Sequence, residues 1–405
     1  MTPLTETEPG QTRHQGSPSE VLGAFLKLGL TSFGGPIAHL GYFRTEFVER
    51  RRWLDDNAYS DLVALCQFLP GPASSQVGMA LGLGRAGWAG LLAAWAGFTL
   101  PSALALILFA YGIAHHQDLA QSGWVHGLKI VAVAIVAQAV WGMAKNLCPD
   151  RPRATVAILA ALITLTLPSA LGQISAIALA GLWGAVSLRH ISAPSYAAHA
   201  YPVSRRQGIA ALTLFSLLLI GLPLWVASAS SPVLTLLDGV YRAGALVFGG
   251  GHVVLPLLQA TVVPDGFVSN ADFVAGYGAA QAVPGPLFTF AAYLGTIADG
   301  PLGGWAGGLT LLGAIFLPAV LVLIAALPFW EALRHRAGMQ AALAGVNAGV
   351  VGILLSALYD PVWTSAIHDK TDFGLALAAF ALLVYGRMPP VFVVALTSAS
   401  AWLIG

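Results

Sequence analysis

Long apolar stretches, separated by short polar segments, run along nearly the whole length of this 405-residue chain. The clearest cover residues 88–113, 125–144, 155–171, 209–227, 305–329 and 342–358. Because an α-helix needs about 20 apolar residues to cross the hydrocarbon core of a bilayer, each stretch is long enough, or nearly so, for one crossing. The pattern predicts an all-α polytopic membrane protein with no soluble domain between its helices.

Composition supports this class. Hydrophobic residues make up 57% of the chain and charged residues only 9%, against roughly 25% charged residues in soluble domains. The formal net charge of +1 gives no indication of a nucleic-acid partner. Residues 1–20 are polar and rich in Pro, Gly, Ser and Thr, which predicts a disordered tail. They lack the apolar core of a secretory signal, so we expect the first membrane segment to insert uncleaved.

The chain contains a repeat. The segment "SFGGPIAHLGYF" from Ser32 recurs as "VFGGGHVVLPLL" from Val247, and "QFLPGP" from Gln67 recurs as "QAVPGP" from Gln281. Three further landmarks follow in the same order: a Gly-Trp pair, a proline and a small-residue helix. Five landmarks in one order indicate two related halves. The predicted divisions are the tail (1–20), a first repeat (21–190), a basic loop with a linker helix (191–230) and a second repeat (231–405).

The distribution of Lys and Arg predicts opposite orientations for the two halves, because short basic loops stay in the cytoplasm. Arg44 and residues 50–52 follow the first Gly-Gly segment, whereas the matching second-half loop, "TVVPDGFVSN", has no basic residue. Arg334 and Arg336 lie where the first half is neutral. One unpaired crossing at 209–227 would invert the second copy. This is the inverted-repeat plan of secondary transporters, with a cytoplasmic N-terminus.

The Pro-Gly-Pro motifs predict helix breaks near the bilayer midplane, since proline lacks the N–H that continues the hydrogen-bond ladder. Residues 23–42 and 58–82 would then enter and return as re-entrant hairpins or cross as two short halves. The alternative is an ordinary crossing with a kink at Gly or Pro. A break in hydrocarbon is tolerated only where protein or a water-filled cavity receives the freed backbone groups, so each break marks a candidate site.

The first break can form an anion receptor, because the free amides and positive dipole of a restarting helix point outward there. Gln67 and Gln76 flank the break and offer amide groups. The alternative is a purely structural hinge. The candidate residues of this break are Gln67, Pro70, Gly71, Pro72, Ser74 and Ser75.

The second break offers fewer hydroxyl groups, and the two Gly-rich segments beside the breaks would let backbone approach a small ligand closely. Glycine pairs also serve simply as packing points between membrane helices. The two histidines are candidate donors or proton carriers, with hydrogen-bonded packing as the alternative. The candidates are Phe33, Gly34, Gly35, Pro36, His39, Gly249, Gly250, His252, Gln281, Pro284, Gly285, Pro286 and Thr289.

Three further residues carry chemistry that suits an anion. Lys129 begins an apolar segment and would offset negative charge or snorkel to the interface, and Asn347 is its second-half counterpart. Arg44 would attract an anion at the cytoplasmic end. Asp61 is a candidate proton site, with exposure to the headgroups as the alternative. No "GxxxxGK[ST]" loop, catalytic triad or metal-ligand cluster is present, so we expect no ATP drive, no enzyme activity, no cofactor and no metal.

The paired signatures, "FGGP" with a downstream Trp-Leu at Trp53 and "QFLPGP", then "FGGG" and "QAVPGP", resemble the long-chain bidomain type of the chromate ion transporter family. The resemblance extends from about Val21 to near the C-terminus. It implies export of chromate across the bacterial inner membrane and chromate resistance, with antiport against protons or drive by the membrane potential. It also implies sulfate as a competing analogue.

The residues leave the alternatives open: an anion channel on the same scaffold, or sulfate uptake with chromate as a passenger. Both ions are tetrahedral dianions of similar size, which hydrogen-bond donors in a sequence cannot separate. Expected partners are the oxyanion, protons, the lipid bilayer and a second copy of the chain in a homodimer.

Overall fold

The computed structural model describes residues 16–33, 35–115, 123–167, 169–188, 201–229, 231–248, 251–300, 302–330 and 337–404. Every regular element in these ranges is helical, which confirms the all-α prediction. Five helices are long and apolar enough to cross a membrane, within residues 73–112, 123–147, 205–229, 304–329 and 338–366. The chain is a helical membrane protein.

Helix α1 begins inside the predicted tail. The Ser17 side chain caps α1 by accepting a hydrogen bond from the Glu20 amide, so residues 18–20 are helical and do not belong to a disordered tail. The helices that follow differ widely in length, from the 7 residues of η1 to the 43 of α4. The elements are α1 (Pro18–Thr31), α2 (Gly35–Phe43), the π-helical η1 (Arg44–Arg50), α3 (Asp56–Phe68), α4 (Ala73–His115), α6 (Gly123–Leu147), α7 (Arg151–Thr166) and α8 (Ala170–Ser187).

The second repeat has the same succession after the linker helix α9 (Arg205–Ala229). Its elements are α10 (Pro232–Ala245), η2 (Gly251–Val253), α11 (Val254–Val262), α12 (Asn270–Ala280), η3 (Leu287–Thr289), α13 (Phe290–Ile297), α14 (Gly304–Ala326), η4 (Leu327–Phe329), α16 (Ala337–Ala357), η5 (Leu358–Trp363), α17 (Thr364–Ala366), α18 (Lys370–Val384) and α19 (Pro390–Ile404).

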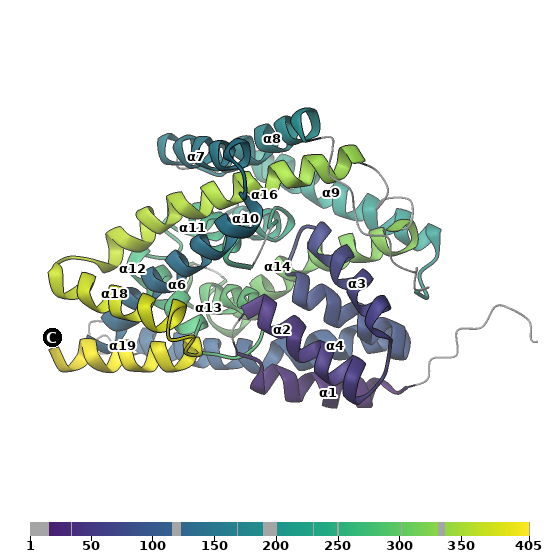
Figure 1. Ribbon diagram of the computed structural model, residues 1–405, viewed down its shortest axis with the longest axis horizontal. Helices are drawn as coiled ribbons and strands as arrows, with labels where there is room; N and C mark the ends of the chain where they lie inside the picture. Colours follow the sequence, from purple (N-terminus) through teal and green to yellow (C-terminus); the bar gives the residue numbers. More distant parts are fainter. Residues whose placement is uncertain are drawn as a thin grey trace, which may run out of the picture.

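One predicted apolar stretch is wrong in its boundary. Residues 155–171 do not form a single crossing: α7 ends at Thr166, and Ser169 caps α8 through the amide of Gly172. The capping serine satisfies an amide at the start of α8, so the chain turns between two helices. These two helices pack on α16 (Figure 1).

The two Gly-rich segments break their helices as predicted. α1 ends before Phe33 and α2 starts at Gly35, while α10 ends before Val247 and η2 starts at Gly251. In each half the helix before this break packs closely on a long helix. A Cβ on Gly29 of α1 would lie 2.4 Å from the carbonyl oxygen of Gly97 in α4. A Cβ on Gly244 of α10 would lie 2.2 Å from that of Ile315 in α14, so the two contacts are equivalent.

The long helix α4 also contains a reversal that the apolar pattern does not reveal. Ala86 and Gly87 depart from helical geometry, and Gly87 has a φ of 64°. The two parts of α4 then lie against each other, because a Cβ on Gly90 would approach the Gly82 carbonyl oxygen to 2.1 Å. Gly304, at the matching place where α14 begins, has a φ of 70°. Each half therefore has a short helix after the Pro-Gly-Pro break and a turn at a left-handed glycine.

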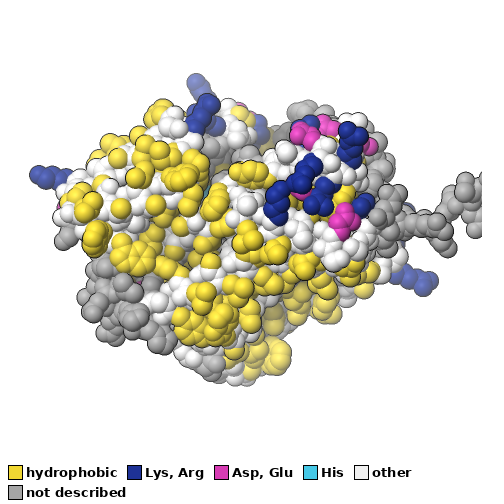
Figure 2. All heavy atoms as spheres, turned by 90° about the horizontal axis from the view of Figure 1, so that it is seen from below, with side chains coloured by type: hydrophobic (Ala, Val, Ile, Leu, Met, Phe, Trp, Pro, Cys, Tyr) yellow, Lys and Arg dark blue, Asp and Glu magenta, His cyan; other side chains and the backbone are white. Residues whose placement is uncertain are grey.

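The outer surface is suited to lipid. Apolar side chains cover much of the face in Figure 2, and basic and acidic groups gather toward one end. The linker helix α9 is the clearest case, since its most apolar window has a mean hydropathy of 2.3 and only 6% of it is buried. Such a helix would be unstable in water, whereas acyl chains solvate it.

Candidate functional site

The two Pro-Gly-Pro breaks are real interruptions. Residues 69–72 separate α3 from α4, and residues 281–286 separate α12 from η3. Gly71 has a φ of 117° and Gly285 a φ of 93°, in a region that side chains disfavour. The prolines on either side supply no N–H, so the glycine amide is the free donor at the centre of each motif.

Each of these two glycine amides donates a hydrogen bond to the opposite half of the chain. Gly71 N–H donates to the carbonyl oxygen of Val247 over 2.7 Å, and Gly285 N–H donates to that of Ser32 over 2.9 Å. Ser32 and Val247 occupy the same position in the two Gly-rich segments. Each Pro-Gly-Pro break is therefore held by the Gly-rich break of the opposite half.

Side chains around the breaks also form hydrogen bonds between the two halves. The Ser102 hydroxyl of α4 donates to the Pro284 carbonyl oxygen. In the other direction, Gln76 Nε2 donates to the carbonyl oxygens of Pro70 at 2.9 Å and Ala319 at 3.3 Å. Ala319 of α14 is the counterpart of Ser102. The four breaks thus form one centre between α4 and α14, which satisfies backbone groups that hydrocarbon would leave unpaired.

His39 belongs to the framework of this centre. Its Nε2 lies 3.2 Å from the Ser32 carbonyl oxygen, so Nε2 carries the proton, and Nδ1 accepts from the Ser74 hydroxyl at 3.4 Å. The imidazole is 1% exposed and meets the ring of Phe98 edge-on. Both ring nitrogens are occupied, which favours the packing interpretation over direct ligand binding.

The hydroxyl groups after the breaks differ in their availability. Ser75 Oγ is buried and has no hydrogen-bond partner in the described part of the chain, whereas the Thr289 hydroxyl donates to the Pro286 carbonyl oxygen at 2.8 Å. An unpaired buried hydroxyl costs about 1–3 kcal/mol, which a ligand oxygen would recover.

The flanking glutamines also differ. Gln67 is exposed at the end of α3, while Gln76 is fully buried across the break. Gln281, the counterpart of Gln67, is half-buried, and its Nε2 has no acceptor among the described residues. Gln76 therefore holds the first break, and Gln281 remains available at the second.

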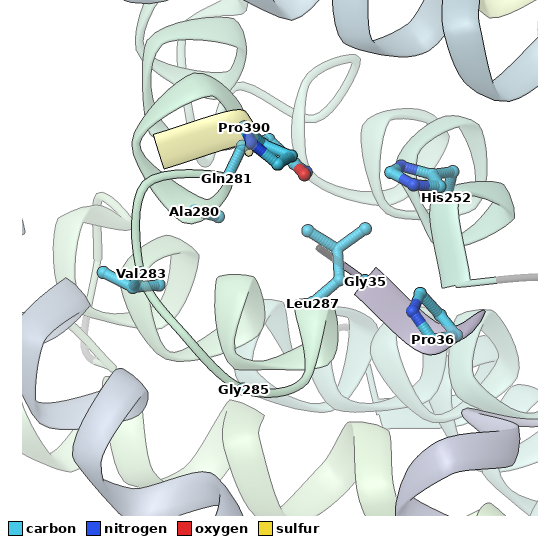
Figure 3. A pocket seen from close by; sticks show the side chains of 9 residues that line it. All are labelled: Gly35, Pro36, His252, Ala280, Gln281, Val283, Gly285, Leu287 and Pro390. Carbon is cyan, nitrogen blue, oxygen red and sulfur yellow. The ribbon is translucent and has the colours of Figure 1, made fainter. Parts of the chain in front are cut away.

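A small cavity lies between the first Gly-rich segment and the second Pro-Gly-Pro break (Figure 3). Space for the centres of water molecules is about 20 Å³, enough for roughly one water and less than an oxyanion needs. Its described lining contains no acidic side chain. The lining residues are Gly35, Pro36, His252, Ala280, Gln281, Val283, Gly285, Leu287 and Pro390.

His252 presents a donor to this cavity. The hydroxyl of the buried Tyr277 lies 2.6 Å from His252 Nδ1, so a donating phenol leaves the ring proton on Nε2. The imidazole points toward the same space as Gln281 and Leu287 (Figure 3). The terminal amide of Gln281 can exchange its oxygen and NH₂ by a half-turn. The cavity thus offers neutral hydrogen-bond donors to a ligand with acceptor atoms. Tyr277 was not expected from the sequence, since a buried tyrosine one helix away gives no local signal.

The predicted cationic groups lie elsewhere. Arg44 is exposed and pairs with Glu49 at 2.5 Å and Asp56 at 2.7 Å. Lys129 is half-buried in α6 and interacts electrostatically with Asp272. Asp272 lies in the first turn of α12, whereas the Pro-Gly-Pro break follows the last turn of that helix. The structure therefore does not bring these two cations to the cavity.

The other predicted residues are distributed as follows. Asn347 is half-buried in α16, and Phe33 is half-buried beside the first break. Pro72 and Pro286 are buried, while Pro70 and Pro284 are partly exposed. Gly34, Gly249 and Gly250 lie outside the described residues.

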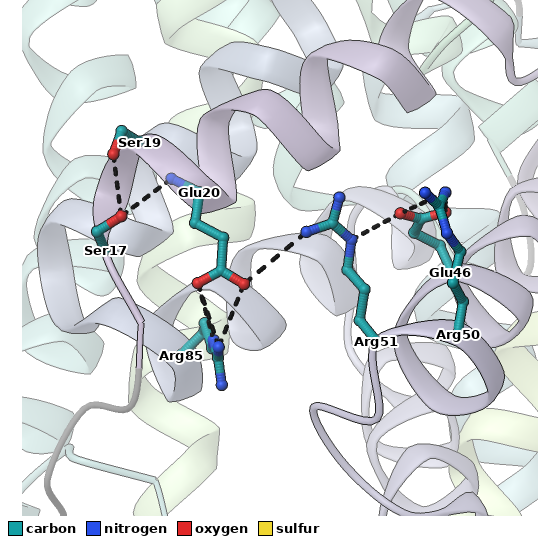
Figure 4. A network of polar contacts seen from close by, with 7 residues as sticks. All are labelled: Ser17, Ser19, Glu20, Glu46, Arg50, Arg51 and Arg85. Atoms are coloured by element: carbon teal, nitrogen blue, oxygen red, sulfur yellow. Dashed lines mark hydrogen bonds and ion pairs between the residues drawn. The ribbon is translucent and has the colours of Figure 1, made fainter.

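A separate polar cluster fixes the basic segment of the first half (Figure 4). Buried Glu46 binds Arg51 at 2.6 Å, Arg50 at 2.9 Å and Lys27 at 3.6 Å. Glu20 joins Arg85 of α4 to Arg51. Burial opposes ionisation of Glu46, but the hydrogen bonds and charges of its basic partners prevail and hold its pKa below the usual value. These arginines serve the local structure.

Two related halves of broken helices, joined at a central polar site, define a membrane transport protein. The chain belongs to the chromate transporter family, whose model matches residues 19–185 and 234–403. It is 27% identical to a chromate transport protein of Pseudomonas aeruginosa over 95% of this chain and 92% of the relative. It is 26% identical to one of Cupriavidus metallidurans, over 89% and 86%.

A third relative is an uncharacterized transporter of Methanocaldococcus jannaschii, 25% identical over 88% of each chain. No solved structure is significantly similar to the chain.

Proposed function

We propose that this protein is a secondary active transporter that exports chromate across the bacterial inner membrane in exchange for protons. The proposal rests on the family and on relatives that are named chromate transport proteins. Removal of the anion from the cytoplasm would confer chromate resistance, and the basic segment after α2 supports a cytoplasmic N-terminus.

The observation that carries the proposal is the set of donors at the interlocked breaks. His252 Nε2–H and the Gln281 amide face a cavity that no carboxylate lines. A tetrahedral oxyanion presents four acceptor oxygens, and neutral donors in a low-dielectric site bind it strongly because water does not compete there. Ser75 is a third donor without a partner at the same centre.

The reciprocal contacts support alternation between the halves. The pairs Gly71–Val247 and Gly285–Ser32 are what two copies related by a pseudo-two-fold axis would form. The cavity is too small for chromate as it stands, so binding requires the repeats to separate at these contacts. Rocking of one repeat against the other, as in inverted-repeat transporters, would open the site to each side in turn.

Flux measurements in proteoliposomes test the proposal. Labelled chromate and labelled sulfate are followed while the pH gradient and the membrane potential are set independently. We expect a proton gradient to drive chromate against its own gradient, with sulfate as a weaker competitor. Strictly downhill movement would indicate a channel, and inward concentration of sulfate in preference to chromate would indicate sulfate uptake.

Two matched variants test the site. Gln281→Ala removes the glutamine at the cavity and should lower chromate flux. Gln67→Ala removes the exposed glutamine at the same position of the first repeat and should leave flux unchanged. Equal flux from both variants, in protein that still folds in the membrane, would refute the assignment of the anion site to the second break.

A further inference from the structure

A buried ion pair in α10 takes no part in the proposed anion site. Asp238 Oδ2 accepts a hydrogen bond from Arg242 Nη2 at 2.5 Å, one helical turn along the same helix. The Asp238 side chain is 3% exposed and that of Arg242 30%. The first repeat has Gly23 and Lys27 at these positions, so only the second repeat contains the pair.

Residues beside this pair in α10 contact the middle of two membrane helices, α9 and α14. The Tyr241 hydroxyl donates to the carbonyl oxygen of Phe215, near the middle of α9. Gly244 lies against the carbonyl oxygen of Ile315, in the middle of α14. Ionisable side chains at this depth are costly, and those that occur usually serve ion or proton movement.

Asp238 differs from the other buried carboxylates in the described part of the chain. Glu46 is surrounded by three basic side chains. Both oxygens of Asp61 lie 3.1 Å from Trp330 Nε1, and those of Asp372 accept from His126 and from the His368 amide. In contrast, Asp238 Oδ1 is buried with no hydrogen-bond partner among the residues that the structure describes. It has a lone pair free to take a proton.

A second small cavity, between α8, α10 and α11, is lined by Arg242 and by Gly239, the residue next to Asp238. Its space for the centres of water molecules is about 20 Å³, enough for roughly one water. The other polar groups on its wall, Gln173 and Thr261, are neutral, and Gln173 Oε1 and Arg242 Nε are buried without partners. No second acid or base lines this cavity in the described part of the chain.

We propose that Asp238 is the carboxylate that takes up the coupling proton, and that Arg242 is the group whose pairing this proton changes. The inference rests on the proposed exchange of chromate for protons. A proton arriving through water adds to Oδ1, converts the carboxylate into a carboxylic acid and later leaves from the same oxygen on the other side. No other bond forms or breaks. Protonation removes the charge that holds Arg242.

The position of Arg242 connects this event to the anion site. Its backbone carbonyl oxygen accepts from the Leu246 amide in the last turn of α10, and the next residue, Val247, accepts the Gly71 amide of the opposite repeat. Release of the Arg242 side chain therefore loosens the end of α10, which leads directly to the contact between Val247 and Gly71. Opening of that contact is the step that we assign to alternation.

The test uses the full chain in liposomes that contain a pH-sensitive dye, with the membrane potential clamped. Exchange of labelled for unlabelled chromate is measured alongside proton movement driven by a chromate gradient. For Asp238→Asn we expect chromate exchange to persist and the chromate-driven proton movement to be lost. Proton movement that persists in this variant would overturn the inference.

The matched control is Asp372→Asn, a buried carboxylate whose oxygens already have partners, and it should keep both activities. If Asp238→Asn fails to fold because Arg242 is left unpaired, the double variant Asp238→Asn/Arg242→Gln removes both charges and should show the same loss. Loss of chromate exchange in folded protein would also overturn the inference. Wild-type protein that moves chromate without protons would overturn it together with the antiport, and wild-type protein that moves no chromate would overturn the proposed function itself.

Discussion

Alanine substitutions at four glycines should separate the backbone strain at the breaks from close packing. Gly285 combines a φ of 93° with close neighbours, since a Cβ there would lie 2.6 Å from Ser102 Oγ and 3.0 Å from the Phe98 carbonyl oxygen. Gly35 has a φ of 78° but nothing within 4 Å. Gly244 has the contact without the unusual φ, and Gly313 has neither.

These environments give an order of destabilisation. A left-handed conformation costs a residue with a side chain about 1–2 kcal/mol. Overpacking costs about 1–3 kcal/mol. Gly285→Ala should therefore lose about 2–5 kcal/mol, and Gly35→Ala about 1–2 kcal/mol. Gly244→Ala should lose about 1–3 kcal/mol from overpacking, and the better helix propensity of alanine should reduce this loss. Gly313→Ala gains the same propensity without a close contact, so its stability should be unchanged or about 1 kcal/mol higher.

The assay is thermal unfolding of the purified protein in one detergent, with the folded fraction followed by size-exclusion chromatography. The unfolding temperatures should rise in the order Gly285→Ala, then Gly244→Ala and Gly35→Ala, then wild type and Gly313→Ala. A Gly285→Ala variant as stable as Gly313→Ala would refute the view that the second break is a strained, closely packed turn.

Three further results are expected. Tyr277→Phe removes the phenol hydroxyl that orients His252. The loss of this hydrogen bond, about 1 kcal/mol, should weaken equilibrium binding of labelled chromate several-fold. Unchanged affinity would exclude Tyr277 as a positioning residue. Ser75→Ala deletes an unpaired hydroxyl, so thermal stability should stay or rise while chromate flux falls, and a fall in both would indicate a structural role. Glu46→Gln should destabilise the protein by about 1–3 kcal/mol near neutral pH. The folded-state pKa of Glu46 is depressed, so its contribution to stability is present above the ordinary carboxyl pKa of 4.5 and is lost as the pH falls through the lower folded value. The difference in stability between wild type and Glu46→Gln in unfolding scans should therefore shrink at acid pH.

The residues that sequence reasoning placed correctly are those whose role follows from local chemistry. Proline lacks an N–H and glycine tolerates a positive φ, so the breaks around Gly71 and Gly285 could be predicted from a few letters. The choice between Gln67 and Gln76 could not, because it depends on which face of each helix meets α14. Arg44 was expected near an anion, but its flexible side chain forms ion pairs with Glu49 and Asp56, two carboxylates close to it in the sequence.

The pair Asp238 and Arg242 had a signal that went unused. An acid and a base one turn apart in a helix next to a Gly-rich break are a recognisable pattern. Their burial, and the oxygen of Asp238 that is left without a partner, become visible only when α8, α9, α11 and α14 surround them.

The sequence by itself determined the class of protein, the positions of the breaks and the division into two related halves, because hydrophobic length, proline and glycine act through the chain's own backbone. Only the tertiary structure decided that each Pro-Gly-Pro break is held by the Gly-rich break of the other half, through Gly71 to Val247 and Gly285 to Ser32. A freed backbone amide in hydrocarbon must find an acceptor, but which acceptor it finds depends on how helices far apart in the chain pack.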